Sequence, residues 1–209
     1  NLDSVIKGEV VWTVVPASGI FFGRLFLTGK VELHKTVAVA GSEIKTPGYA
    51  EVLVGTPLSS FVANQLKAAD HVRLINGNPL TGVKATTADF VGGHTSEITA
   101  IPEGDDNDEM LGWILPRTEQ FSTSRSYLSW LFGKKKEYNL DARVKGGERH
   151  MIMSGEYDKV LPMDIYGEYL IKAIITGDVD KQEQLGIYEV GREDFAEAEL
   201  VDSSNLELG

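Results

Sequence analysis

The stretch from residue 37 to residue 66 constrains the fold most, because two strand patterns are followed there by a helical pattern. Val37 to Ala40 and Tyr49 to Val54 are apolar runs on either side of a turn that contains glycine and proline. Thr56 stands where a helix N-cap belongs, and Pro57 takes the first helical position. The apolar residues that then follow at helical spacing are Leu58, Phe61, Val62 and Leu66. The stretch predicts a strand-turn-strand-helix unit.

Further apolar runs extend this unit into a sheet. Val72 to Ile75 predicts a returning strand, and His94 to Ile101 and Met110 to Leu115 predict two more. Before the unit, Val10 to Val15 and Ile20 to Leu27 indicate two buried strands around a Pro-Ala-Ser-Gly turn. A strand pair, a helix across it and a returning strand favour a small mixed-sheet, β-grasp-like domain.

The last third of the chain changes to helical periodicity. Asp164 is a plausible N-cap, an apolar face follows it, and Gly177 is placed to end the helix. A shorter helix is predicted from Asp180 to Leu185. The fold class predicted for the whole chain is α+β, with a mixed sheet followed by a small helical domain.

Composition limits what such a chain can do. The 209 residues include no cysteine, which excludes thiolate metal sites and favours a reducing, intracellular location. The formal net charge of -11 argues against nucleic acid as a partner. No apolar run approaches the roughly 18 residues of a membrane span. Because the sequence starts at Asn1, we expect it to be part of a longer protein.

The stretch ERHMIMSGEYDKVLP, residues 148–162, has the spacing of a ferredoxin cluster loop without its cysteines. Bacterial ferredoxins hold iron-sulfur clusters with C-x2-C-x2-C-x3-C-P. A second copy of the template fits residues 192–203. The cysteine positions of the two templates fall on Met151, Ser154, Tyr157 and Leu161, and on Arg192, Phe195, Ala198 and Asp202. None of these side chains ligates iron as a thiolate does.

The segment SYLSWLFGKKK, residues 126–136, combines aromatic side chains with three consecutive lysines. This composition suits an anionic membrane surface or an acidic partner. The candidate docking residues are Tyr127, Trp130, Leu131, Phe132, Lys134, Lys135 and Lys136. The alternative is a short helix whose aromatic side chains, Trp130 and Phe132 included, are buried in the chain's own core.

The sequence predicts no catalytic, cofactor-binding or metal-binding residue. It contains no dinucleotide fingerprint, no P-loop and no nucleophile elbow. The acidic cluster at Asp105, Asp106, Asp108 and Glu109 lacks the glycine and the spacing of a calcium loop. The four histidines stand too far apart for the short pairings of zinc sites.

Several stretches together resemble one family, the A subunits of the sodium-translocating NADH:quinone reductase. They include VVWTVVPASGIFFGRLFLTGK, RLINGNPLTG, FSTSRSYLSWL, GERHMIMSGEYDKVLPMDI and GDVDKQEQLGIYEVGREDF. The resemblance implies that residues 1–35 finish a preceding nucleotide-fold-like domain. It also implies a soluble-ligand-binding (SLBB) β-grasp domain with an insertion at residues 36–145, and a helical domain at residues 146–209. That last domain would resemble a two-cluster ferredoxin that has lost its clusters. Family members keep a cysteine-proline pair where this chain has Asp202 and Ser203.

The resemblance also implies a function. The family is a peripheral component on the cytoplasmic face of the bacterial inner membrane, in an enzyme that oxidises NADH, reduces ubiquinone and exports sodium. The flavins and the 2Fe-2S cluster belong to other subunits, and the A subunit docks on the membrane-embedded B subunit and is associated with ubiquinone. Two alternatives stay open, a soluble ligand-binding module without a redox role and an active iron-sulfur carrier. The missing cysteines argue strongly against the second alternative.

Overall fold

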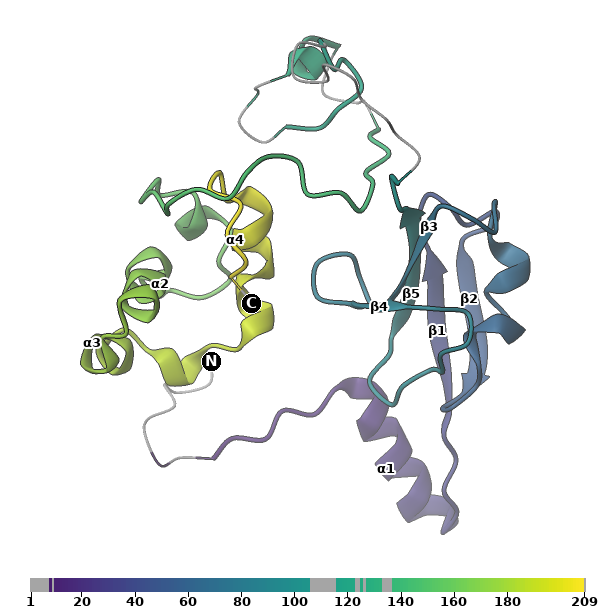
Figure 1. Ribbon diagram of the computed structural model, residues 1–209. Coiled ribbons are helices and arrows are strands. Elements are labelled where there is room, and N and C mark those ends of the chain that lie inside the picture. Colours follow the sequence, from purple (N-terminus) through teal and green to yellow (C-terminus); the bar gives the residue numbers. More distant parts are fainter. Residues whose placement is uncertain are drawn as a thin grey trace. The chain divides into compact units, whose positions relative to one another are not determined.

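The computed structural model describes residues 8, 10–105, 116–122, 125, 127–132 and 137–208. These residues divide into a sheet unit within Val14–Arg143 and a helical unit within Val144–Gly209, to which the first residues, Asn1–Thr13, also belong. Each unit has its own hydrophobic core. Figure 1 labels the strands of the sheet unit and the helices of the helical unit. The mixed sheet and the small helical unit confirm the predicted α+β class.

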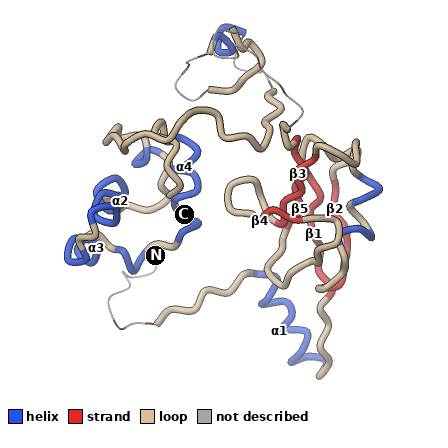
Figure 2. The backbone as a smooth tube through the Cα atoms, in the orientation of Figure 1, coloured by secondary structure: helices blue, strands red, loops and turns tan. Residues whose placement is uncertain are grey.

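The sheet unit is built on a mixed sheet of five strands in the order β2-β1-β5-β3-β4. Its strands are β1 (His34–Ala40), β2 (Gly48–Leu53), β3 (Val72–Asn76), β4 (Val83–Ala85) and β5 (Glu97–Pro102). The pair β1·β5 is parallel, and β1·β2, β3·β4 and β3·β5 are antiparallel. Figure 2 shows these strands in red. Ile98, Thr99 and Ala100 are consecutive and all buried, so β5 is covered on both faces. The strands predicted at residues 37–40, 49–54, 72–75 and 94–101 correspond to β1, β2, β3 and β5.

The helix predicted after Thr56 is wrong, because the structure has two 3-10 turns there, η1 (Leu58–Ser60) and η2 (Ala63–Gln65). Backbone groups of this segment bond to other parts of the unit instead of continuing a helix. Leu58 N–H donates to Asp89 O at 2.8 Å, and Gln65 O accepts from Lys45 N–H at 2.8 Å. Leu58 and Val62 nevertheless fill the core, as their spacing predicted.

The strands predicted at Val10 to Val15 and Ile20 to Leu27 are also wrong. Residues 10–15 have no regular structure, and α1 (Pro16–Thr28) is a helix. Pro16 occupies the first helical turn and Gly29 ends the helix in the left-handed region, with φ of 67°. The assignment of residues 1–35 to a preceding domain stays a prediction. The strand expected at residues 110–115 lies outside the described residues.

The helical unit contains α2 (Gly167–Thr176), α3 (Val179–Gln184) and α4 (Ala196–Val201), with a 3-10 turn, η7 (Arg192–Phe195), before α4. Gly177 ends α2 as predicted, but Tyr166 and not Asp164 is the N-cap residue. Asp178 caps α3 by accepting a hydrogen bond from Lys181 N–H. No helix in the described part of the chain is both long and apolar enough to cross a bilayer.

Candidate functional site

The two predicted cluster loops come together in the core of the helical unit. The first loop is irregular from Met151 onward and contains a 3-10 turn, Tyr157–Lys159, whereas the second forms η7 and α4. Of the eight cysteine positions, Met151, Tyr157, Phe195 and Ala198 are buried, Leu161 and Asp202 are half-buried, and Ser154 and Arg192 are exposed. Side chains therefore occupy the space between the loops.

Tyr157 and Asp202 join the two loops directly. Tyr157 has no exposed surface, and its hydroxyl donates to Asp202 Oδ1 at 2.6 Å. Burial, together with this bond, raises the pKa of Tyr157 well above its usual value. Burial would also raise the pKa of Asp202, but hydrogen bonds from Tyr157 and from the backbone N–H groups of Leu206 and Ser204 hold it below the usual value. The pair is therefore a neutral phenol bonded to a carboxylate at neutral pH.

The Tyr157–Asp202 bond links two specific template positions. Tyr157 is the third position of the first loop and Asp202 is the fourth position of the second. In two-cluster ferredoxins the fourth cysteine of a loop ligates the cluster of the other loop. In the template, the positions of Tyr157 and Asp202 belong to two ligands of a single cluster. In this chain a hydrogen bond joins the two side chains instead.

Leu161, the fourth position of the first loop, lies in apolar surroundings. Leu161 packs with Phe195 and Ala198, the second and third positions of the second loop, in the same core. Gly167, at the start of α2, has no room for a side chain because a Cβ there would overlap Leu161 Cδ1, and Phe195 Cε1 would lie 3.9 Å away. On the two-cluster template, the Tyr157–Asp202 bond would cross the place of one cluster, and the packing around Leu161 would fill the place of the other.

Two residues of α2 that sequence reasoning missed hold the first loop in place. Glu168 is 4% exposed, and its Oε1 accepts from Gly155 N–H at 2.6 Å and from Ser154 Oγ at 3.5 Å. Lys172 Nζ donates to the carbonyl oxygen of Met151 at 3.0 Å. The sequence did contain one signal for these contacts, a charged residue on an otherwise apolar helix face. A buried charge needs a partner, so this residue could have been expected to bond to a neighbouring segment.

The arrangement is suited to holding the two loops together. The chain contains no cysteine, and within the described residues no three His, Asp or Glu side chains are grouped to hold an ion. The Asp202 carboxylate is already engaged by Tyr157 and by Leu206 N–H, which lies 2.9 Å from Oδ2.

The predicted docking residues divide into described and undescribed positions. Leu128–Phe132 is a 3-10 helix, η4, in which Trp130, Leu131 and Phe132 are 51–63% exposed and Ser129 is buried. The alternative interpretation, in which Trp130 and Phe132 are buried in the chain's own core, is therefore wrong for this structure, and the docking role stays a prediction. Tyr127 is half-buried, and Arg117 lies 5.6 Å from its ring centroid. Lys134, Lys135 and Lys136 lie outside the described residues.

The sheet unit carries a separate cavity of about 330 Å³. Its lining residues are Asn76, Gly77, Asn78, Thr81, Gly82, Val83, His94, Thr95, Ser96 and Glu97. Asn78 Oδ1 accepts from Leu80 N–H and Thr81 N–H, which shapes one wall as a tight turn. Most of the lining residues are polar, but apolar atoms provide about half of the lining surface.

Comparisons with known proteins identify relatives of the chain. Residues 36–87 match the family NQRA_SLBB, described as the NQRA C-terminal domain. Over 209 residues the chain is 33% identical to the A subunit of the Na(+)-translocating NADH-quinone reductase of Pasteurella multocida. It is 34% identical over the same length to that of Neisseria meningitidis serogroup C and 32% identical to that of Haemophilus influenzae strain PittEE.

Each of these matches covers 100% of the chain and 46% of the relative, so the chain spans about half the length of the curated relatives it matches. The family match at residues 36–87 falls on β1 to β4 and confirms the expected SLBB domain. The chain is therefore similar, over all 209 of its residues, to the C-terminal half of the A subunit of the Na(+)-translocating NADH-quinone reductase, and the resemblance found in the sequence is confirmed.

Proposed function

We propose that the chain is part of a peripheral subunit of a sodium-translocating NADH:quinone reductase, on the cytoplasmic face of a bacterial inner membrane. The observation that carries the proposal is the similarity to the A subunit along the whole chain. The whole enzyme would oxidise NADH, reduce ubiquinone and export sodium with flavins and a 2Fe-2S cluster that other subunits hold. The part assigned to this chain is structural, by docking on the membrane-embedded B subunit, and through that contact it is linked to the quinone step.

The helical unit supports a structural role. Six of its eight template positions, all but Ser154 and Arg192, hold side chains that pack in one core or bond across it, and the chain has no thiolate to offer a cluster. A module of this kind can present a fixed surface to a partner without carrying electrons. The redox groups of the enzyme would then lie in other subunits.

The surface proposed for docking is the η4 segment with the lysines that follow it. Trp130, Leu131 and Phe132 are more than half exposed, and aromatic side chains are enriched at interfaces. A chain of net charge -11 is repelled by an anionic surface, so a local cationic stretch favours contact there. Each lysine near an anionic membrane contributes about 1 kcal/mol.

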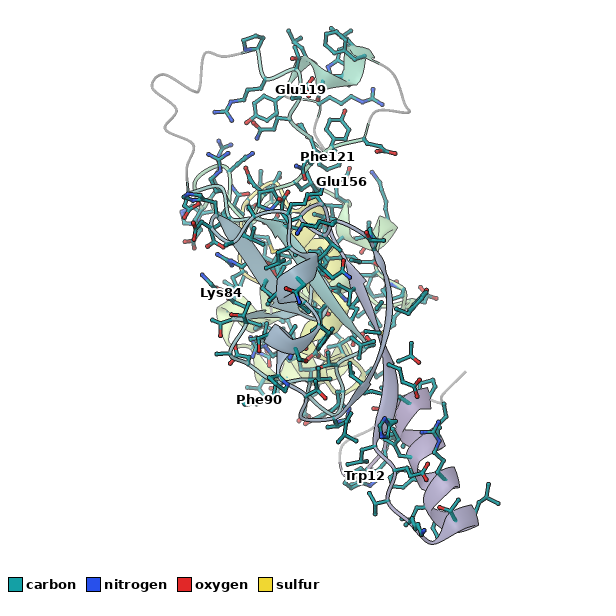
Figure 3. All side chains as sticks on the ribbon, turned by 90° about the vertical axis from the view of Figure 1, so that its right-hand side faces the viewer. Trp12, Lys84, Phe90, Glu119, Phe121 and Glu156 are labelled. Carbon is teal, nitrogen blue, oxygen red and sulfur yellow. The ribbon has the colours of Figure 1, made fainter. Side chains whose placement is uncertain are left out.

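A pull-down of the tagged full-length protein from solubilised membranes tests the proposal. We expect membrane subunits, the B subunit among them, to copurify. Replacing Lys134, Lys135 and Lys136 by glutamate should leave the isolated protein folded but weaken assembly and quinone reductase activity. Trp130→Ser with Phe132→Ser should act in the same direction. The matched control is Tyr49→Ser with Phe90→Ser, two exposed aromatic residues elsewhere in the sheet unit; Figure 3 shows Phe90 at its surface.

Recovery of a clean monomer from solubilised membranes would rule out membership of the complex. Normal assembly after both the lysine and the aromatic changes would remove the docking role from η4 and leave the rest of the proposal in place.

The cavity of the sheet unit favours a second candidate function, a soluble ligand-binding module. Its lining residues include Asn76, Asn78, His94, Ser96 and Glu97. Amides, hydroxyls and a carboxylate around a small volume suit a neutral, polyhydroxylated ligand. Its walls are preformed, since Thr95 Oγ1 donates to Asn76 Oδ1 at 2.6 Å and Thr99 Oγ1 donates to Gly77 O at 2.8 Å.

Titration of the chain with ribitol, followed by amide NMR shifts of residues 76–83 and 94–97, tests this second candidate. Asn78→Asp is the informative variant, because it keeps the acceptor oxygen that shapes the turn and removes the amide donors. We expect saturable shifts that Asn78→Asp weakens at least tenfold. Shifts that stay linear with concentration would exclude a specific polyol site.

A further inference from the structure

Strand β2 lies at one edge of the sheet, beside β1 (Figure 1). Val54, which follows β2, donates its N–H to Leu33 O at 3.1 Å, so these two residues form a hydrogen-bonded pair. In an antiparallel ladder, hydrogen-bonded pairs alternate with pairs that are not bonded. Counted back from Val54 along the register, the even-numbered residues of β2 bond to β1. The backbone N–H and C=O groups of Tyr49 and Glu51 therefore point away from β1.

These outward backbone groups have no partner in the part of the chain that the structure describes. No hydrogen bond there reaches the N–H or C=O group of Tyr49 or of Glu51. Free groups that recur at every second residue match the hydrogen-bonding pattern of an extended segment laid alongside. The opposite edge strand, β4, has three residues, and a short edge strand offers little to a partner. Of the two edges, β2 is the one suited to pairing with another strand.

The side chains on the outer face of β2 determine which strand fits there. Tyr49 is 84% exposed, Leu53 is 47% exposed, and Glu51 lies exposed between them. Among the described residues, the Glu51 carboxylate has no ion-pair or hydrogen-bond partner. Opposite charges that face each other across two strands attract, and aromatic residues pair well with β-branched ones. The best partner strand therefore places a cation opposite Glu51 and apolar residues opposite Tyr49 and Leu53.

Charge disfavours a second copy of the chain as this partner strand. A self-pairing centred on Glu51 would bring two glutamates face to face, and each chain has a net charge of -11. We propose that the β2 edge binds an extended, basic segment of another protein by strand addition, with a lysine or arginine opposite Glu51. This surface includes no residue of η4, and the inference does not rest on the proposed function.

A synthetic peptide with the sequence TVTRTVT, blocked at both ends, tests the inference. Its arginine lies between two valines on one face of an extended strand. The sequence reads the same in both directions, so the peptide can add in parallel or antiparallel orientation. Amide hydrogen exchange of the 209-residue chain is measured by NMR, residue by residue, with and without the peptide. Strand addition has its own signature, because every second amide of β2 gains a partner.

We expect saturating peptide to slow exchange of the Tyr49 and Glu51 amides by about tenfold or more. The amides of Ala50 and Val52 already bond to β1 and should not change. Glu51→Lys should weaken binding of TVTRTVT by about fivefold or more and strengthen binding of the matched acidic peptide TVTETVT. Asp70→Lys is the control, since it makes the same charge change at an exposed residue outside the strands, and it should keep the wild-type preference.

Absence of protection at Tyr49 and Glu51 would overturn the inference, and so would equal binding of the basic and acidic peptides by the wild-type chain. Slowing of all exposed amides alike would also contradict it, because a cation attracted to an acidic chain has no preference for alternate residues. Protection of the same two amides that rises with the concentration of the chain alone would assign the edge to a second copy. No membrane subunit is involved, so failure of the docking proposal would leave these results unchanged.

Discussion

Tyr157 is fully buried with a polar atom at its tip, so its stability in the core depends on a single acceptor, Asp202. A hydrogen bond to a charged group contributes about 1.5–3 kcal/mol, and an orphaned buried acceptor costs a comparable amount. The same bond fixes the distance between two segments that are 45 residues apart in the sequence. A single residue pair therefore has a large share in the geometry of the helical unit.

Tyr157→Phe should lower the free energy of unfolding of the helical unit by about 1–3 kcal/mol at pH 7. Because the pKa of Asp202 is held below its usual value, its bonds stabilise the fold above the ordinary carboxylate range. That contribution is lost as the pH falls through the lowered pKa. Urea unfolding of both proteins at pH 7 and in acid measures the difference, which should shrink in acid. Equal stability at pH 7 would show that the bond contributes nothing.

Gly167→Ala should destabilise the helical unit by about 1–3 kcal/mol, because the new Cβ would overlap Leu161 Cδ1. Helix propensity alone predicts the opposite sign, a gain of up to about 1 kcal/mol. Gly23→Ala in α1 is the control, since no atom lies within 4 Å of a Cβ there, and it should not destabilise. Thermal unfolding by circular dichroism distinguishes the two signs.

For single residues, the sequence predicts some of the positions that are buried in the helical unit, but it does not predict which side chains bond to one another. Of the eight positions that the template spacing picked out, Met151, Tyr157, Phe195 and Ala198 are buried, whereas Ser154 and Arg192 are exposed. It could not show that Tyr157 bonds to Asp202, since a spacing rule describes each loop separately. The sequence did not predict the contacts of Glu168 and Lys172, because their partners are backbone groups of the first loop. A pattern of side chains carries no information about such partners.

At the scale of elements, the three strands of one sheet edge share an ion-pair network. Arg73 of β3 and Lys84 of β4 both bond to Glu103, which directly follows β5. The hydrogen bond with Arg73 is the main cause that lowers the pKa of Glu103 to about 2, with Lys84 contributing to the shift. The network thus holds β4, β3 and β5 together at one end.

Glu103→Gln should therefore weaken this edge at neutral pH. With a folded pKa near 2 against an ordinary 4.5, the carboxylate stabilises the fold fully above about pH 5. The effect is lost as the pH falls through 2, and it amounts to about 3 kcal/mol at most. Hydrogen exchange of β3 and β5 amides should be faster in the variant at pH 7 and equal to wild type at pH 2. Unchanged exchange at pH 7 would contradict this account.

Some strands and helices of this chain were easier to predict than others. The alternating pattern of β1 and the glycine-proline turn before β2 were sufficient to place both strands. The run Ile20 to Leu27 was ambiguous, because an apolar run of this length fits a buried strand or a helix. Pro16 and Gly29 were the local signals that favour a helix. The segment after Thr56 has helical spacing, but its backbone bonds to residues 43–45 and 87–89, which the local sequence does not reveal.

At the scale of the whole molecule, the two hydrophobic cores have no residue in common. One comprises residues between Val37 and Ala100, and the other comprises residues between Met151 and Leu208. We therefore expect two separable unfolding transitions. Leu170→Ala, a fully buried position of α2, should lower the stability of the helical unit by about 2–5 kcal/mol and leave the sheet unit unchanged.

Val37→Ala is the reciprocal change, and it should act on the sheet unit alone. Hydrogen exchange resolved by segment gives both answers in one experiment. A single transition that shifts as a whole with either variant would show that the units unfold together.

The sheet order has a consequence for how the chain is made. Strand β5 is the last of the described strands in the sequence, yet it lies in the middle of the sheet, between β1 and β3. During synthesis β1 and β2 emerge first, and β3 and β4 follow, and each two strands can form an antiparallel pair. Each pair then has an unpaired edge strand until residue 102 has left the ribosome. Open edges invite pairing with other chains. The interval before β5 inserts is therefore when a nascent chain most needs a chaperone, and a chain truncated before Glu97 should aggregate.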